Sequence, residues 1–315
     1  MQVGWIGLGE IGGPMARRAL LAGHRILAYE RGQAVKELRA GGVALSRDYT
    51  TIAAACEVLT ICLFNDAQVK AVLLDQGALA AMRPGSVLVL HTTGSPELAR
   101  QLQDAAPEGV AVLDATFSGS PAQAEHGTLT IMVGGATEAV ARAQPLLASY
   151  AARVHHVGLL GQGQVVKLLN NLLFAANLRF AAEVLGLAER QGLDPGTCAR
   201  IFQGCSSAST AGALFADCRN AGSHARLPEQ GRRHCSRQLA GTGPIKCDAG
   251  AGDCQLCTRL IAGKVRRQLS HSGRGSSGGI GQGSGELRHF GQRAERVVKM
   301  RASIRARQSL HHGAT

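Results

Sequence analysis

A glycine-rich turn near the start of the chain constrains its fold more than any other sequence feature. The apolar run Gln2–Ile6 is typical of a buried strand and leads into Gly7-Leu8-Gly9-Glu10-Ile11-Gly12, where a helical pattern begins at once. In such a GxGxxG turn, Gly7 permits a tight turn, Gly9 lets the backbone approach a diphosphate, and Gly12 allows close helix packing. Unpaired N–H groups at the helix start attract the anion. The turn therefore predicts a dinucleotide-binding βαβ unit.

An acidic residue, Glu30, follows the next apolar run, Arg25–Tyr29. A carboxylate at this position accepts a hydrogen bond from the ribose 2′-OH and repels a 2′-phosphate, which favours NAD. Arg31 comes directly after it and weakens that preference. The predicted cofactor is therefore NAD, with NADP left open.

Up to about residue 204, short apolar runs alternate with amphipathic segments, as in a parallel sheet flanked by helices. Strands are expected at Gln2–Ile6, Arg25–Tyr29, Val58–Leu63, Ser86–Leu90, Val110–Leu113 and Leu129–Val133, and helices at Gly12–Leu21, Gln33–Ala40, Ala67–Leu74 and Pro96–Leu102. This rhythm predicts the α/β fold class, with a doubly wound Rossmann domain over residues 1–160.

A long helix is expected after this domain. From Gly163 to Gln191 the apolar residues fall three or four apart, and Gly192 then ends the pattern. Asp194 and Pro195 form an N-cap and first-turn pair for a following helix that reaches about Phe202. We interpret residues 161–204 as an interdomain helix and the start of an all-helical domain.

The composition changes beyond Gly204. Residues 1–204 hold 16 Lys and Arg against 16 Asp and Glu, whereas residues 205–315 hold 18 against 6, so the formal charge of +12 belongs to the tail. This Gly-, Arg- and Ser-rich segment contains few apolar residues to offset the cost of ordering a backbone, about 1 to 2 kcal/mol per residue. We expect residues 205–315 to be poorly ordered, apart from a late helix at Arg293–Arg307.

The predictions for cellular location and for metal binding rest on sequence patterns that the chain lacks. The chain has no run of about 18 apolar residues and no signal-peptide pattern, so a cytoplasmic protein without a membrane segment is expected. Cys254 and Cys257 have neighbours at spacings that fit no familiar zinc site, and no metal site is predicted.

Three ordered motifs lie within the first 204 residues. They are Ile6–Ala16, Asp114–Ser120 with Gly127-Thr128-Leu129 after it, and Gly161–Asn171. Together they resemble the 3-hydroxyisobutyrate dehydrogenase family, whose cofactor domain is of the 6-phosphogluconate dehydrogenase type. Only Ile11 departs from the first motif, where Met is usual.

The resemblance implies a set of site residues. Lys167 would be the general acid/base, and its ammonium near an oxygen that gains negative charge would stabilise the transition state. Asn171, one helical turn further, and the turn Ser118-Gly119 would bind substrate. Thr93 would approach the nicotinamide. Cofactor-binding positions are Gly7, Gly9, Ile11, Gly12, Glu30 and Thr93.

The implied function is hydride transfer between NAD(P) and a small 3-hydroxy acid or its semialdehyde, such as 3-hydroxyisobutyrate or tartronate semialdehyde. Family members complete the cleft and associate through an all-helical domain, and nothing after Phe215 resembles it. We therefore expect that domain to be incomplete. A homo-oligomer is left open, but its usual helical interface is expected to be missing.

Two alternatives remain open. The tail composition is typical of GC-rich DNA read out of frame, so a frameshift between about Gly204 and Ala221 would leave a cofactor-binding pseudoenzyme. The basic tail could instead be a nucleic-acid-binding arm, although it lacks the aromatic residues that stack on bases.

Overall fold

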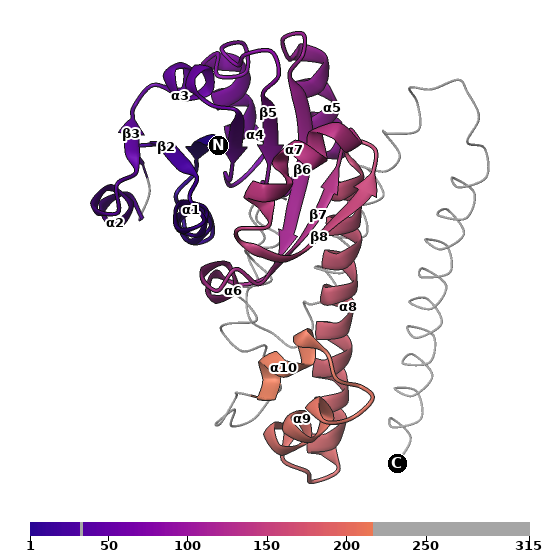
Figure 1. The fold of residues 1–315 in the computed structure, drawn as a ribbon. Helices are drawn as coiled ribbons and strands as arrows, with labels where there is room; N and C mark the ends of the chain where they lie inside the picture. Colours follow the sequence, from indigo (N-terminus) through magenta and orange to yellow (C-terminus); the bar gives the residue numbers. More distant parts are fainter. Residues whose placement is uncertain (32–33, 217–315) are drawn as a thin grey trace, which may run out of the picture. The chain divides into compact units, whose positions relative to one another are not determined.

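The structure is a computed structural model, described here for residues 1–31 and 34–216 (Figure 1). Its strands are β1 (Gln2–Ile6), β2 (Arg25–Tyr29), β3 (Ala44–Ser46), β4 (Val58–Ile61), β5 (Val87–Leu90), β6 (Ala111–Ser118), β7 (Leu129–Gly134) and β8 (Ala151–Gly158). Its helices are α1 (Gly12–Leu21), α2 (Val35–Ala40), α3 (Tyr49–Ala55), α4 (Asp66–Lys70) with the π-helical turn η1 (Ala71–Asp75), α5 (Pro96–Ala105), α6 (Pro121–Glu125), α7 (Thr137–Leu147), α8 (Gln162–Arg190), α9 (Pro195–Gln203) and α10 (Thr210–Ala216).

The strands form one eight-stranded sheet in the order β3-β2-β1-β4-β5-β6-β7-β8. The chain first moves outward from β1 to β3 and then returns to place β4 on the other side of β1. In doubly wound sheets, ligands bind outside the carboxyl ends of the strands where the order reverses in this way. The glycine turn after β1 lies at that reversal. The predicted Rossmann fold is confirmed.

Two apolar clusters, one on each face, bury the sheet. Helices α1, α2 and α7 cover one face, with Trp5 and Tyr150 among its fully buried residues. Helices α3, α4 and α5 cover the other face, over Ile61 and Leu88. Strands buried on both faces explain the continuous apolar runs from which they were predicted.

The predicted doubly wound parallel sheet contains one antiparallel step. Strand β7 pairs antiparallel with β6, while every other neighbouring pair is parallel. Only the short helix α6 lies between β6 and β7, and this connection is shorter than the dozen or more residues that a parallel crossover needs.

Strand β6 runs to Ser118 rather than ending at Leu113 as predicted. Asp114 follows the apolar residues Val110–Leu113. In the structure Asp114 is fully buried, because its carboxylate accepts backbone hydrogen bonds from the start of α8. At this position the polar residue therefore marks a tertiary contact and not the end of the strand.

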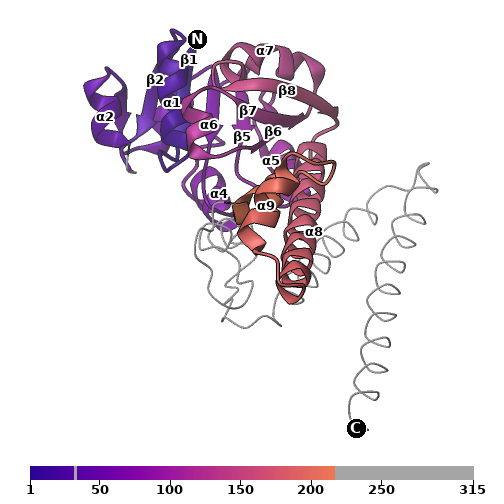
Figure 2. The ribbon, with the colours of Figure 1, turned by 90° about the horizontal axis from the view of Figure 1, so that it is seen from below.

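Helix α8 leaves the sheet and carries the remaining helices. It contacts β6, β7 and β8 near its start, and α9 and α10 pack against it further along (Figures 1 and 2). Asp194 caps α9 by accepting the Thr197 N–H at 2.6 Å, as predicted. Helix α10 lies beyond residue 204, the predicted end of the helical part.

By length and composition alone, α8 could cross a membrane, with a mean hydropathy of 1.2 over its most apolar window. A single such helix is weak evidence, because buried core helices and signal sequences pass the same test. The predictions for the rest of the tail, including the late helix at 293–307 and the cysteines at 254 and 257, lie outside the described residues.

Candidate cofactor and substrate site

The candidate site residues lie at one edge of the sheet. Strands β2, β1, β4, β5 and β6 are neighbours and run parallel, so their carboxyl ends meet there. Glu30 follows β2, Gly7 follows β1, and Thr93 follows β5 by a short loop. Ser118 ends β6. Along this edge the predicted ribose, diphosphate, nicotinamide and substrate contacts follow one another in spatial order.

Only one of the three glycines in the glycine turn, the middle one, has room for a side chain in the part of the chain that the structure describes. A Cβ atom at Gly7 or Gly12 would overlap a backbone carbonyl oxygen, that of Cys62 or of Gly7 respectively, and Gly7 has a φ of 109°. Among the described residues, a Cβ at Gly9 would meet nothing within 4 Å. Ile11, the N-cap of α1, provides no side-chain cap. The start of α1 has no side-chain cap, and the exposed Gly9 precedes it. These two features fit a diphosphate.

Gly9→Ala should separate cofactor binding from folding. The added methyl group has room in the protein but would occupy the path of the diphosphate. We expect the Kd for NADH to rise by about tenfold or more, equivalent to about 1.4 kcal/mol, with an unchanged melting temperature. Gly186→Ala on α8, where a Cβ meets only ordinary contacts, is the matched control. An unchanged Kd for Gly9→Ala in a fluorescence titration would show that no diphosphate lies there.

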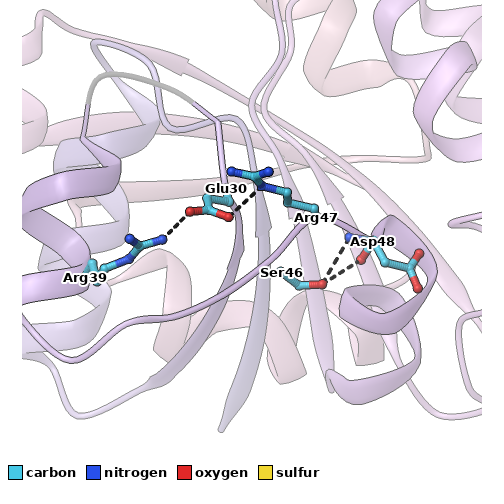
Figure 3. A network of polar contacts seen from close by, with 5 residues as sticks. All are labelled: Glu30, Arg39, Ser46, Arg47 and Asp48. Atoms are coloured by element: carbon cyan, nitrogen blue, oxygen red, sulfur yellow. Dashed lines mark hydrogen bonds and ion pairs between the residues drawn. The ribbon is translucent and has the colours of Figure 1, made fainter.

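Glu30 lies between two arginines (Figure 3). Its Oε1 accepts a hydrogen bond from Arg39 and its Oε2 one from the Nε of Arg47 at 2.8 Å. These bonds, led by that from Arg47, lower the pKa of the Glu30 carboxyl. The ionised carboxylate can still accept a hydrogen bond from a ribose hydroxyl, but two arginines already engage it.

Thr93 lies on a loop that is held from both sides. The Leu63 N–H donates to the Thr92 hydroxyl at 2.9 Å, and the Ser95 N–H donates to Asp66 at 3.0 Å. The side chain of Gln164, from α8, accepts from the Gly94 N–H at 2.9 Å and donates to the Thr92 carbonyl at 2.8 Å. The predicted nicotinamide loop is therefore joined directly to α8.

Asp114 fixes the start of α8 against the sheet. It accepts the N–H of Gly161 at 2.7 Å and that of Gln164 at 2.6 Å, and the nearby Thr116 hydroxyl donates to the Gly163 carbonyl at 2.9 Å. A carboxylate at a helix N-terminus is also favoured by the helix dipole. These bonds determine where the following turn of α8 places its side chains.

That following turn carries Lys167, which is only 5% exposed. Burial lowers the pKa of its amine from the ordinary 10.5 to about 8. Over residues 1–31 and 34–216, no hydrogen bond or ion pair engages this amine. An unpaired amine with a pKa near neutrality can take up or release a proton at working pH.

The three predicted substrate-binding residues come from the end of β6 and from α8, and they make no hydrogen bonds with one another among the described residues. Asn171 is half-buried one turn beyond Lys167, and only a long contact of 3.5 Å joins its amide to Asn170. Gly119 has a φ of 147°, and Ser120 after it caps α6. The side chains of Ser118 and Asn171 thus remain available to a ligand.

Sequence reasoning missed Asp114 and Gln164 as positioning residues, and Arg39 and Arg47 as partners of Glu30. Asp114 and Gln164 lie inside two of the three motifs, so their place in a motif was the available signal. Arg39 and Arg47 had none. Among the described residues, no group of three His, Cys, Asp or Glu side chains could hold a metal ion.

Comparison with known proteins matches the chain to nicotinamide-enzyme families. Residues 2–158 match the family described as the NAD binding domain of 6-phosphogluconate dehydrogenase, and residues 161–220 match that described as NAD-binding of NADP-dependent 3-hydroxyisobutyrate dehydrogenase. The two matched ranges contain every residue of the candidate site.

Individual relatives agree. The chain is 37% identical to an NAD-dependent L-serine dehydrogenase of Pseudomonas aeruginosa, over 67% of this chain and 72% of that protein. It is 34% identical to a 3-hydroxyisobutyrate dehydrogenase of the same bacterium, over 68% and 72%. The solved structure of a Mycobacterium tuberculosis 3-hydroxyisobutyrate dehydrogenase with L-serine superimposes with a TM-score of 0.65 at 26% identity, covering 85% of this chain and 94% of that one.

Proposed function

Because the chain belongs to the 3-hydroxyisobutyrate dehydrogenase family, we propose that it oxidises a small 3-hydroxy acid with NAD(P), reversibly, and that Lys167 exchanges the proton. One observation carries the role of Lys167. Its side chain is buried, its amine has no hydrogen-bond or ion-pair partner among the described residues, and Gln164 joins its helix to the loop of Thr93.

The cofactor supplies the hydride acceptor when it is bound. The turn Gly7–Gly12 with Ile11 would hold its diphosphate, Glu30 its adenosine ribose, and Thr93 would lie toward its nicotinamide. This order follows the sequence of carboxyl strand ends along the sheet.

The protein's own part of the reaction is proton transfer and substrate orientation. In the oxidative direction, the neutral Lys167 amine accepts the proton of the substrate hydroxyl, and the hydride passes to the cofactor from the carbon that bears this hydroxyl. The products are a carbonyl group and a lysine ammonium. In the reverse direction the ammonium returns the proton to the carbonyl oxygen. The Ser118 hydroxyl and the backbone of Gly119 would bind the substrate carboxylate, and the Asn171 amide would hold the substrate oxygen.

A turnover assay tests the function directly. The purified full chain is given L-serine, 3-hydroxyisobutyrate and, in the reverse direction, tartronate semialdehyde, each with both nicotinamide cofactors. We expect turnover of at least one of these compounds. Tight NADH binding with no turnover of any of them would instead support the cofactor-binding pseudoenzyme.

The pH dependence of turnover should report Lys167. Since its pKa is about 8 and the base must be neutral, kcat/KM for oxidation should rise with pH and level off above about pH 8. Reduction needs the ammonium form, so its rate should fall above the same pH. Profiles that are flat between pH 6 and 9 in both directions would contradict a lysine acid/base.

The proposal includes association between copies of the chain. Leu169, Leu173, Val184 and Leu187 are exposed apolar residues of α8, and at helical spacing they lie on one face. Contiguous apolar surface of this kind supports a protein contact. Sedimentation velocity of the full chain would measure its oligomeric state, and a strictly monomeric chain would contradict this part of the proposal.

A further inference from the structure

The carboxylate at the predicted ribose position is enclosed by cationic side chains. The Glu30 side chain is 22% exposed, whereas those of its partners Arg39 and Arg47 are 60% and 80% exposed. Figure 3 shows the two guanidinium groups reaching Glu30 from opposite sides, one from α2 and one from the end of β3. Among these three side chains, one negative charge is therefore shared by two positive ones.

The backbone fixes where Arg47 emerges. The Glu30 N–H donates to the Ser46 carbonyl at 2.9 Å, which joins the end of β2 to the end of β3. On either side of Arg47, the Asp48 N–H donates to the Ser46 hydroxyl at 3.1 Å, and Asp48 then caps α3. The backbone at Arg47 is thus held by hydrogen bonds on both sides, while its side chain is largely exposed and contacts Glu30.

Exposed ion pairs exchange partners easily. A pair between exposed side chains contributes about 0 to 1 kcal/mol, because water competes with both partners. A phosphate dianion offers more acceptor oxygens and more charge than one carboxylate, and guanidinium groups bind it through paired hydrogen bonds. A phosphate that reached this position could therefore draw both arginines away from Glu30.

We infer that Arg39 and Arg47 form a binding site for the 2′-phosphate of NADP(H), which Glu30 occupies as an internal substitute when the cofactor carries a free 2′-hydroxyl. With NAD(H), the carboxylate stays between the arginines and accepts the hydroxyl. With NADP(H), the arginines turn to the phosphate. The chain therefore uses both cofactors, and the arginines determine its affinity for only one of them. This inference rests on the cofactor site of the proposed function and does not depend on Lys167.

The experiment compares cofactor affinities in variants of the full chain by fluorescence titration at low salt. Arg39→Ala combined with Arg47→Ala should raise the Kd for NADPH by about tenfold or more, since hydrogen bonds to charged groups are lost, and should change that for NADH by less than about twofold. Glu30→Gln should act in the opposite sense, with tighter NADPH and weaker NADH binding. Added salt should weaken NADPH binding more than NADH binding.

Arg25→Ala is the matched control, because Arg25 is an exposed arginine at the opposite end of β2 from Glu30. It should leave both affinities unchanged. Melting temperatures of all variants should agree with that of the parent chain, since only exposed ion pairs are removed. If the double variant is nevertheless less stable, Arg39→Lys with Arg47→Lys keeps the charges and should lose only part of the NADPH affinity.

A shorter probe separates this inference from the proposed function. Adenosine 2′,5′-bisphosphate and 5′-AMP differ at the 2′ position and lack the nicotinamide, and calorimetry should show tighter binding of the bisphosphate, with the difference lost in the double variant. That result supports the inference even if no hydroxy acid is turned over. Equal loss of NADH and NADPH binding in the double variant, or equal binding of the two adenosine probes to the parent chain, would overturn it.

Discussion

Replacing Lys167 with alanine is expected to lower kcat for hydroxy acid oxidation by about 10²- to 10⁴-fold, the usual contribution of a general acid/base. The loss should appear in kcat and not in the Kd for NADH, because the Lys167 amine makes no described contact with the cofactor-binding turn Gly7–Gly12. NADH should bind the variant as it binds the parent chain. Steady-state kinetics together with a fluorescence titration of NADH would measure both effects.

The fold should not suffer from the loss of this amine. Lys167 is buried and makes no hydrogen bond or ion pair over the described part of the chain, so Lys167→Met replaces a desolvated polar group by an apolar one of similar length. We expect the Met variant to be inactive and at least as stable as the parent. Lys70→Ala, at an exposed lysine of α4, is the control for charge. Activity of Lys167→Met within about threefold of the parent would exclude the amine from the chemistry.

Asp114→Ala is expected to destabilise the protein by about 2 to 5 kcal/mol. The substitution leaves the N–H groups of Gly161 and Gln164 without their acceptor inside the protein, and each unsatisfied buried group costs about 1 to 3 kcal/mol. Asp114→Asn keeps one carbonyl acceptor and should cost less. Urea denaturation followed by circular dichroism measures the difference.

The same substitution should also affect catalysis, because Asp114 anchors the turn that precedes Lys167. In Asp114→Asn, which retains more of the fold, we expect kcat to fall more than NADH affinity. Glu97→Ala, which removes an exposed ion pair in the first turn of α5, serves as the control and should change stability by less than about 1 kcal/mol. A stability of Asp114→Ala equal to that of the control would mean that the carboxylate does not hold α8.

Much of the fold could be predicted because its signals are local. The glycine turn, the apolar strands and the caps at Asp194 and Gly192 each depend on residues within a few positions of one another. Strands β3 and β8 were not predicted, since β3 is only three residues long and β8 lies at the sheet edge with mostly exposed or half-buried side chains. The antiparallel step at β7 depends on a connection length, and the apolar pattern does not report that length.

The candidate site divides in the same way. The sequence by itself determined the diphosphate turn, the acid after β2, and the spacing of Lys167 and Asn171 on one helix, because backbone geometry and helical period require no distant partner. Only the tertiary structure decided that two arginines share Glu30, that Asp114 holds α8, and that Gln164 reaches a loop 72 residues earlier. Such contacts join residues from separate elements, and they arise only when the sheet brings the ends of its strands together. Burial of Lys167, which lowers its pKa, likewise arises from packing between elements and from no pattern along the chain.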